Sequence, residues 1–423
     1  MNSSRHMNGA LRRSAFFLLV LFLGLWLAVP ASANSFRNWW QEIIQDFIAA
    51  NDVPSYEWEL INEDSKWAAR AGLQVLSHRG DFYLIAGRTP NPPSFPFVPG
   101  DSKIWGDVWK SEDRGESWTR ILETNDAEHW PARAYFQALK KGRYMYVIGG
   151  QNFKTVPNEC PPFVPDCPAV VPTSDFFNDV WRSRDGVHWE QRTADAGFAP
   201  RAGLSAVVHR RAMYVMGGSV NDDEAIVAGA PAREYFNDVW KSYNGKRWIR
   251  VTENAPWQAR AGAVVVSKGR YMYLIGGEDG FVCEPLPFCE PPYFNDVWRS
   301  VDGRKWEQMT PAADWVARPG HQCVVVLDKI ACFGGFGLLS NPMDVWTSRN
   351  GADWKQVSES PWNATDPSMI KYDFDALVVS DGFRGSKPKI YTFGGDRETF
   401  DFADPTNYLN VDNDVWRFSP PVD

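Results

Sequence analysis

The chain has 423 residues, of which 44% are hydrophobic and 23% are charged, and this composition favours a folded protein with a sizeable core over a disordered one. Its formal net charge is −8 at neutral pH. An acidic chain is a poor candidate for binding nucleic acid or an anionic membrane through its overall field. The 21 tryptophans are unusually many and indicate that a Trp-containing unit recurs along the chain.

Residues 1–33 have the features of a secretory signal peptide. Arg12 and Arg13 precede an apolar stretch from Ala15 to Val29, and small residues end the segment at Ala33. The stretch is short for a membrane span. We therefore expect cleavage after Ala33, no stable membrane span afterwards, and a secreted, periplasmic or extracellular location; an uncleaved anchor is the alternative. The remaining chain has 41 basic and 52 acidic residues, a net charge of −11.

Residues 34–54 are predicted to form an amphipathic helix and a linker. Ser35 is a suitable helix N-cap, and apolar residues recur at helical spacing over about 36–50. We expect this helix to pack on the outside of the main domain. Contact with a partner or a membrane surface is the alternative.

Two signatures recur through residues 55–423. The first is an apolar run that ends in Gly-Gly (Ala-Gly in the first copy), and its copies end at Gly87, Gly150, Gly218, Gly277, Gly335 and Gly395. The second is Asp-Val-Trp, which begins at Asp107, Asp179, Asp238, Asp296, Asp344 and Asp414. Five of these copies lead into a short turn and another tryptophan: Trp118, Trp189, Trp248, Trp306 and Trp354. Six copies predict six similar structural units.

Each unit is predicted to be a four-stranded antiparallel meander with strands a to d. In the fourth unit we expect these strands at Ala261–Ser267, Tyr271–Gly276, Asp296–Ser300 and Lys305–Thr310. One such unit cannot bury both of its faces, so six units are expected to stack around an axis as an all-β, six-bladed propeller. The last unit lacks strand d, and the segment Glu57–Ile61 has the form of that strand. This segment is predicted to complete the last blade and close the ring.

The repeats resemble the kelch superfamily over nearly the whole chain after residue 33, with Gly-Gly ending strand b and a tryptophan in strand d. The form Asp-Val-Trp-x-Ser-x-Asp/Asn-Gly-x-x-Trp is most similar to exported bacterial kelch proteins. Kelch-like propellers include binding scaffolds, the copper enzyme galactose oxidase and bacterial N-acetylneuraminate epimerase. Ser111–Trp118 is also similar to the sialidase Asp-box, a structural turn between strands c and d. These motifs specify a fold far more than a function.

Six cysteines fall into three close pairs: Cys160 with Cys167, Cys283 with Cys289, and Cys323 with Cys332. The first two pairs lie in proline-rich runs, which form loops rather than helices or central strands. Export and proximity favour a local disulfide within each pair. Metal binding is the alternative, but no His or Cys cluster has zinc-ligand spacing. We predict no metal site and no cofactor.

An aromatic-x-x-Arg pattern begins strand a in five units: Trp67 and Arg70, Trp130 and Arg133, Phe198 and Arg201, Trp257 and Arg260, and Trp315 and Arg318. The sixth Arg position is assigned to Asp373. The kelch resemblance implies that these residues surround the channel mouth, on the face with the long b–c and the d–a loops. Because Arg binds carboxylates and Trp stacks on sugars or cations, they are candidate contacts for an acidic glycan or peptide. The alternative is structural pairing of each Arg with a strand-c Asp.

Enzymatic chemistry has weaker support. The histidines after residue 33 are scattered and suggest no copper set. Acidic candidates for general acid–base chemistry follow the Gly-Gly motifs: Glu278, Asp279, Asp396 and Glu398, with Arg397 beside them; solvated loop charges are the alternative. We therefore predict an exported binding module for a protein or carbohydrate ligand, using the b–c/d–a face. A carbohydrate-active enzyme (epimerase, lyase or hydrolase) on an acidic sugar is the competing hypothesis. No prediction follows for the oligomeric state.

Overall fold

The computed structural model describes residues 57–92, 101–157, 170–221, 232–280, 292–337, 342–363, 371–380, 387–398 and 406–419. All of them belong to one compact unit, Tyr56–Asp423. The predicted signal segment, the predicted helix over 36–50, and the cysteines Cys160, Cys167, Cys283 and Cys289 lie outside the described residues. No helix in the described part of the chain is long and apolar enough to cross a membrane.

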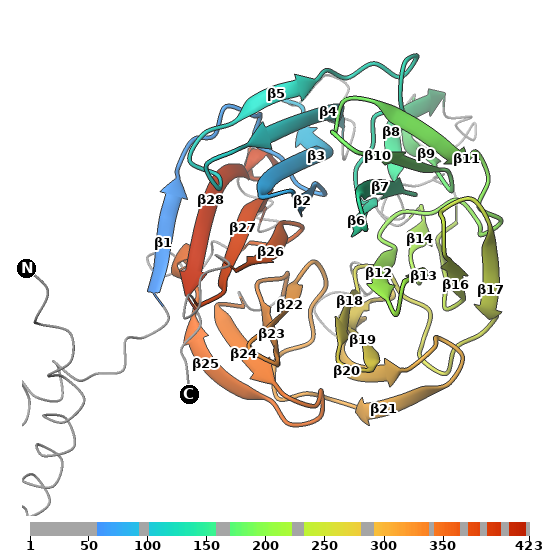
Figure 1. Cartoon of the computed structure of the whole chain (residues 1–423), viewed down its shortest axis with the longest axis vertical. Coiled ribbons are helices and arrows are strands. Elements are labelled where there is room, and N and C mark those ends of the chain that lie inside the picture. The colour runs from blue at the N-terminus through green and yellow to red at the C-terminus, as the bar shows by residue number, and fades with distance from the viewer. Residues whose placement is uncertain are drawn as a thin grey trace, which may run out of the picture. The chain divides into compact units, whose positions relative to one another are not determined.

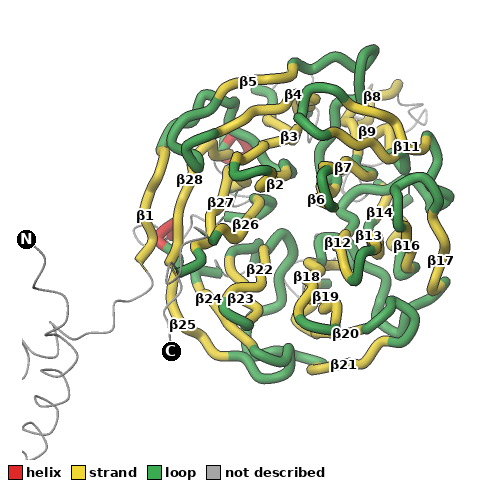
Figure 2. Tube along the Cα trace, viewed as in Figure 1, coloured by secondary structure: helices red, strands yellow, loops and turns green. Residues whose placement is uncertain are grey.

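Six four-stranded antiparallel sheets form the blades of a propeller (Figures 1 and 2). Blade 1 contains β2 (Gln74–His78), β3 (Asp81–Pro90), β4 (Ser102–Ser111) and β5 (Thr119–Leu122). Blade 2 contains β6 (Gln137–Lys141), β7 (Tyr144–Ile148), β10 (Val180–Ser183) and β11 (Trp189–Thr193). Blade 3 contains β12 (Ser205–His209), β13 (Ala212–Met216), β16 (Val239–Ser242) and β17 (Trp248–Thr252). Blade 4 contains β18 (Val264–Lys268), β19 (Tyr271–Glu278), β20 (Tyr293–Ser300) and β21 (Trp306–Thr310). Blade 5 contains β22 (Gln322–Val326), β23 (Lys329–Phe333), β24 (Asp344–Ser348) and β25 (Lys355–Glu359). Blade 6 contains β26 (Asp375–Val379), β27 (Lys389–Asp396), β28 (Val411–Ser419) and β1 (Glu57–Asn62). The prediction of an all-β, six-bladed propeller is confirmed.

Two of the long b–c connections contain paired strands of their own. β8 (Gln151–Pro157) pairs with β9 (Val170–Phe176) in blade 2, and β14 (Ser219–Val220) pairs with β15 (Glu234–Tyr235) in blade 3. Short 3-10 helices at Pro361–Asn363 (η1) and Asn407–Leu409 (η2) are the only helical elements among the described residues. The bases of these connections are therefore ordered extensions of the blades.

Blade 6 combines strands from the two ends of the described chain. β1 pairs antiparallel with β28, with Trp58 opposite Phe418. The Trp58 ring stacks on Phe418 with centroids 4.5 Å apart, and it meets Trp362 of η1 edge to face at 4.8 Å. A slip of one residue would turn Trp58 to the opposite face of the sheet, so this aromatic cluster fixes the register.

The six residues nearest the axis at the start of the a strands form what we call the inner ring: Gly72, Tyr135, Gly203, Gly262, Gly320 and Asp373. Their φ angles all lie between 50° and 64°, in the left-handed region. Backbone N–H groups in this ring donate to the carbonyl of the neighbouring blade at 2.9–3.0 Å, and the bonds run from Gly262 through Gly203, Tyr135, Gly72 and Asp373 to Gly320. A chain of hydrogen bonds thus joins all six blades close to the axis.

Apolar cores fill the spaces between adjacent blades. Glycines of the turns between strands c and d pack against these cores. Gly186 of blade 2 lies against Tyr83 of blade 1, and Gly303 of blade 4 lies against Tyr214 of blade 3. The turn Ser111–Trp118 has the expected Asp-box form: the Ser111 hydroxyl accepts from the Gly115 N–H, and Trp118 Nε1 donates to the Gly115 carbonyl. These turns are structural parts of the blade interfaces.

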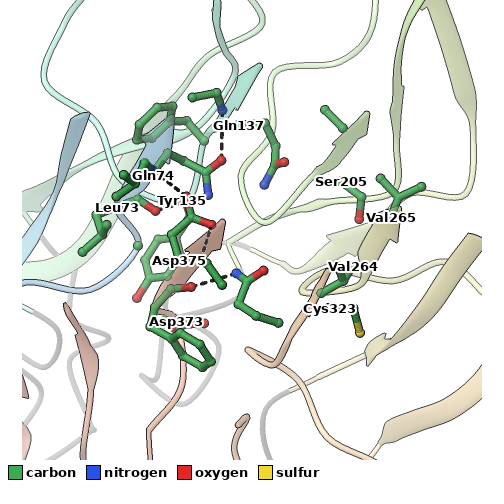
Figure 3. Close-up of a pocket in the computed structure, with 18 of the residues that line it drawn as sticks. Leu73, Gln74, Tyr135, Gln137, Ser205, Val264, Val265, Cys323, Asp373 and Asp375 are labelled. Atoms are coloured by element: carbon green, nitrogen blue, oxygen red, sulfur yellow. Dashed lines mark hydrogen bonds between the residues drawn. The ribbon is translucent and has the colours of Figure 1, made fainter. Parts of the chain in front are cut away.

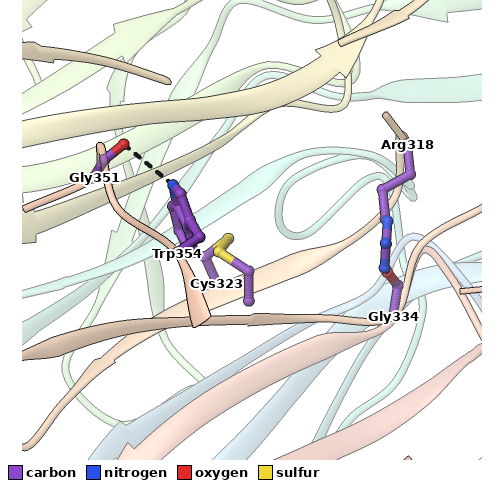
Figure 4. The surroundings of a disulfide bond; sticks show 6 residues. Arg318, Cys323, Gly334, Gly351 and Trp354 are labelled. Carbon is purple, nitrogen blue, oxygen red and sulfur yellow. Dashed lines mark hydrogen bonds between the residues drawn. A yellow bond between two sulfur atoms is a disulfide. The ribbon is translucent and has the colours of Figure 1, made fainter. Parts of the chain in front are cut away.

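A disulfide joins Cys323 and Cys332, which lie opposite each other on β22 and β23 of blade 5 (Figure 4). Both cysteines are buried in the core that also contains Trp354. The predicted local pairing is present here.

Replacing Gly277 by Ala is expected to destabilise the propeller strongly. Gly277 has a φ of 101°, and a Cβ there would lie 2.6 Å from the carbonyl oxygen of Ala261 on the rigid start of strand a. Gly269 is a matched control because its φ is also positive, at 58°, but a Cβ there meets nothing within 4 Å. Urea unfolding should show Gly277→Ala to be less stable than Gly269→Ala by about 2 kcal/mol or more. Equal losses would contradict the close packing of blade 4.

Candidate functional site

The five predicted arginines form buried ion pairs within their own blades. Each side chain is at most 3% exposed and binds the Asp of the Asp-Val-Trp motif through both terminal nitrogens: Arg70 with Asp107, Arg133 with Asp179, Arg201 with Asp238, Arg260 with Asp296, and Arg318 with Asp344. In blade 4 the two bonds are 2.5 and 3.1 Å, and Arg260 also donates to the Gln258 and Gly276 carbonyls. The guanidinium groups thus tie the start of strand a to strand c.

The aromatic partners of these arginines are also buried. Trp67, Trp130, Phe198, Trp257 and Trp315 are at most 3% exposed. Each meets the strand-d tryptophan of its own unit edge to face, with centroids 5.7–6.3 Å apart. This geometry favours the structural alternative for the whole aromatic-x-x-Arg pattern; direct ligand contact by these residues stays a prediction.

The assignment of the sixth position to Asp373 is wrong. Tyr372 forms the backbone bridge to Asp396 that Ala71 forms to Arg88 in blade 1, so Lys371 is the counterpart of Arg70. The fully buried Lys371 ammonium binds Asp414, the strand-c Asp of blade 6, and also Asp412 at 2.8 Å. Sequence reasoning missed it because a lysine replaces the arginine.

A polar group of different residues lies at the channel mouth, and we call it the mouth cluster: Arg88, Tyr135, Tyr372, Asp396 and Glu398. Arg88 Nε donates to Tyr135 Oη at 2.6 Å, and Arg88 Nη2 donates to the buried Asp396 carboxylate at 2.6 Å. The backbone N–H of Glu398 donates to the other Asp396 oxygen at 2.9 Å. The cluster therefore connects blades 6, 1 and 2.

Burial and neighbouring charges perturb the acids of this cluster. Desolvation raises the pKa of Glu398 to about 7, and the adjacent Asp396 charge acts in the same direction. Desolvation also raises the pKa of Asp396, against the lowering effect of Arg88. The pKa of Tyr372 is raised well above its usual value by burial and by the charge of Asp396. A carboxyl that titrates near neutrality beside a second carboxyl is suited to proton transfer.

Two of the five polar candidates named from the sequence, Asp396 and Glu398, belong to the mouth cluster. Arg397 instead binds Asp412 at 2.5 Å, and Asp279 binds the side chain of Gln258. Arg88, Tyr135 and Tyr372 were missed. The available signal was that Tyr135 and Asp373 occupy positions that are glycine in the other four units.

A cavity of about 390 Å³ runs along the axis below the mouth, and we call it the channel cavity. Its wall comes from the innermost strands of all six blades (Figure 3). Side chains seal the joints between blades: Gln74 accepts from the Ala138 N–H at 3.0 Å, and Gln322 donates to the Phe374 carbonyl at 2.7 Å. Across the joint between blades 6 and 1, Asp375 accepts from the Val75 N–H at 2.5 Å.

Across the described ranges, no three His, Cys, Asp or Glu side chains come together so that they could hold a metal ion. His321 is fully buried between blades, where desolvation lowers its pKa to about 3. The structure therefore offers polar recognition and two perturbed carboxyls, rather than a metal centre, in the part of the site that it describes.

Comparison with known proteins agrees with the repeats and the geometry. Residues 172–337 match the family model described as "KLHDC2/KLHL20/DRC7 Kelch-repeats domain". The chain is a six-bladed β-propeller that contains kelch repeats. A solved structure titled "Structure of YjhT" is similar to this kelch propeller, with a TM-score of 0.57 and 15% identity, over 84% of this chain and 96% of that one. No curated protein matches the sequence.

Replacing Arg260 by Met should destabilise the kelch propeller by about 3–5 kcal/mol, because it leaves Asp296 without its partner in a largely buried position. Arg250→Met is the matched control, since Arg250 pairs with Glu253 at 3.0 Å on the exposed surface. The control should cost about 1 kcal/mol or less. Chemical denaturation measures both. A stable Arg260→Met protein would show that the guanidinium is not needed for the blade.

The stability of the kelch propeller should depend on the ionisation of Asp375. Burial raises the pKa of Asp375 from 3.8 to about 7. Because the folded pKa lies above the unfolded one, this group's contribution is complete below about pH 4 and is lost as pH rises through 7, by up to about 4 kcal/mol. His321 has a lowered pKa and acts in the opposite direction, so the difference between wild type and Asp375→Asn isolates the effect.

Denaturation of both proteins between pH 4 and pH 8 measures this difference. The advantage of wild type over Asp375→Asn should shrink as pH rises, whereas Glu253→Gln, an exposed substitution with the same change of charge, should run parallel to wild type. A difference that does not vary with pH would show that Asp375 titrates normally.

Proposed function

We propose that this protein is an exported binding module that recognises a protein or carbohydrate ligand at the mouth of its channel. The observation that carries the proposal is the mouth cluster, in which Arg88, Tyr135 and Asp396 come from three blades and are bonded to one another. Kelch-repeat propellers generally serve as protein-interaction modules, which supports binding as the primary role.

The site is suited to recognition because its supports are rigid. Tyr135 belongs to the inner ring, whose backbone is fixed by hydrogen bonds to both neighbouring blades. Arg88 lies in β3 directly after its Ala-Gly pair, and its backbone pairs with Ala71. Side chains on such a frame lose little conformational freedom on binding, so more of the interaction energy goes into affinity. Guanidinium, phenol and carboxylate groups together suit a ligand that has several hydrogen-bonding groups.

Two further features complete this proposal. Export is supported by the signal-like residues 1–33 and by the Cys323–Cys332 disulfide, since disulfides persist in oxidising compartments. Closure of the ring by the N-terminal strand is supported by the pairing of β1 with β28, which covers an edge that would otherwise be open to aggregation.

A second function, carbohydrate-active catalysis, is favoured by one observation. Glu398 has a pKa raised to about 7 and lies beside Asp396, which Arg88 pairs at 2.6 Å. Such a pair could supply a proton donor and a base at a sugar ring. In this reading the mouth cluster would bind the substrate and Glu398 would transfer the proton.

Binding of the purified protein to an array of neutral and acidic glycans, beside pull-downs from the exported fraction, tests the proposal. Tyr135→Phe removes the hydroxyl that accepts from Arg88, and Glu398→Gln removes the perturbed carboxyl. Tyr243→Phe is the matched control, because Tyr243 is 58% exposed on a c–d turn at the opposite ends of the strands. A true ligand should bind wild type and the control equally and the mouth variants about tenfold more weakly.

A ligand that binds all four proteins equally would place recognition away from the mouth and overturn the proposal. Chemical conversion of a bound sugar that is lost in Glu398→Gln, while its binding remains, would establish the enzyme instead.

A further inference from the structure

The channel cavity has an unusual balance of charge. Its only charged wall residues, among those described, are Asp373 and Asp375, and neither lysine nor arginine lines it. The recurring arginines of the repeats do not line the cavity, because Arg70 and its counterparts are bound to the strand-c aspartates. The cavity is therefore acidic on the side of blade 6.

Asp375 is buried without a cationic partner. Its side chain accepts from the Val75 and Ala376 backbone N–H groups at 2.5 and 2.8 Å, and only 8% of the residue is exposed. Those two bonds leave lone pairs on the carboxylate oxygens. A buried carboxylate is normally paired with a cation, because an unpaired charge is costly away from water.

The wall opposite these aspartates is mostly apolar, and the Ser205 hydroxyl there donates to the Ala263 carbonyl. Val264 and Val265 of blade 4 lie across the cavity from Asp375, while Gln74 and Gln137 lie on its side (Figure 3). The cavity thus offers a carboxylate and amide oxygens on one side and aliphatic surface on the other. This matches an alkylammonium ion, whose head group needs several acceptors and whose chain favours apolar contact.

We propose that the channel cavity is a binding site for a primary alkylammonium group, held by Asp375 with Asp373 near the entrance and with its alkyl part against Val264 and Val265. The group is either a free small amine or a lysine side chain that a partner inserts from the mouth. This inference does not depend on ligand binding by the mouth cluster, since the residues that hold the ammonium belong to the cavity wall.

Calorimetric titration of the full protein with n-propylammonium tests the site. At about pH 8 the amine is protonated and the buried carboxylate is ionised. We expect saturable binding with a dissociation constant of about 1 mM or tighter, and binding at least about tenfold weaker for n-propanol, which has the same shape and no charge. Equal binding of the two, or no saturable binding of the amine, would overturn the proposal.

Variants then locate the site. Asp375→Asn should weaken amine binding about tenfold or more, whereas Glu253→Gln, which removes an equal charge from the exposed surface, should leave it unchanged. Asp373→Asn is a second variant that leaves the Val75 bond intact, and it should weaken binding by a smaller factor. Unchanged amine binding in both aspartate variants would show that the amine binds outside the cavity.

An acetylated Gly-Lys-Gly amide peptide separates the two sources of the ammonium group. Binding of this peptide, lost in Asp375→Asn, would identify a lysine side chain as an acceptable ligand. Binding of n-propylammonium alone would restrict the site to free small amines.

Discussion

The left-handed backbone of the inner ring is the constraint on which the propeller depends. Six chain segments converge on one axis, and five of them turn so that the N–H reaches the carbonyl of the adjacent blade. A φ of 50–64° achieves this, and it is a conformation that glycine adopts without steric cost. This backbone conformation sets the spacing of the blades, the dimensions of the channel cavity and the positions of the side chains at the mouth. Where Tyr135 and Asp373 replace glycine, the surrounding hydrogen bonds hold them in a conformation that they would otherwise avoid.

Away from the axis, a buried ion pair stabilises each blade. An arginine can satisfy a carboxylate and two carbonyl groups at once, which lets it lie fully buried between strands a and c. Blade 6 solves the same problem with Lys371, whose ammonium binds two carboxylates instead of one. The indole N–H that follows each strand-c Asp donates to the same carboxylate, as Trp298 does to Asp296 at 2.7 Å. Each strand-c Asp thus binds both the buried cation of its blade and the tryptophan of the Asp-Val-Trp motif.

The repeats made the fold predictable because their signatures are the residues with the strictest local requirements. Gly277, which has no room for a Cβ, and Asp296, which binds both Arg260 and Trp298, recur for reasons internal to a blade. The same fact made the site hard to predict, since regularly repeated residues such as Trp257 and Arg260 serve the scaffold. The functional candidates are the departures from the repeat. Arg88 gave no local signal of its contact with Asp396, because the two are 308 residues apart and meet only when blades 1 and 6 are adjacent.

Two side chains on the inner ring remove the rotational symmetry that six similar blades would otherwise give to the axis. Tyr135 and Asp373 stand on either side of Gly72, whereas Gly203, Gly262 and Gly320 leave the other half of the ring bare. Among the described residues, the ring therefore has a polar half and a half without side chains. A bound molecule would have one preferred orientation around the axis, with its hydrogen-bonding groups toward blades 6, 1 and 2. A ring of six similar blades thus has a defined direction across its axis.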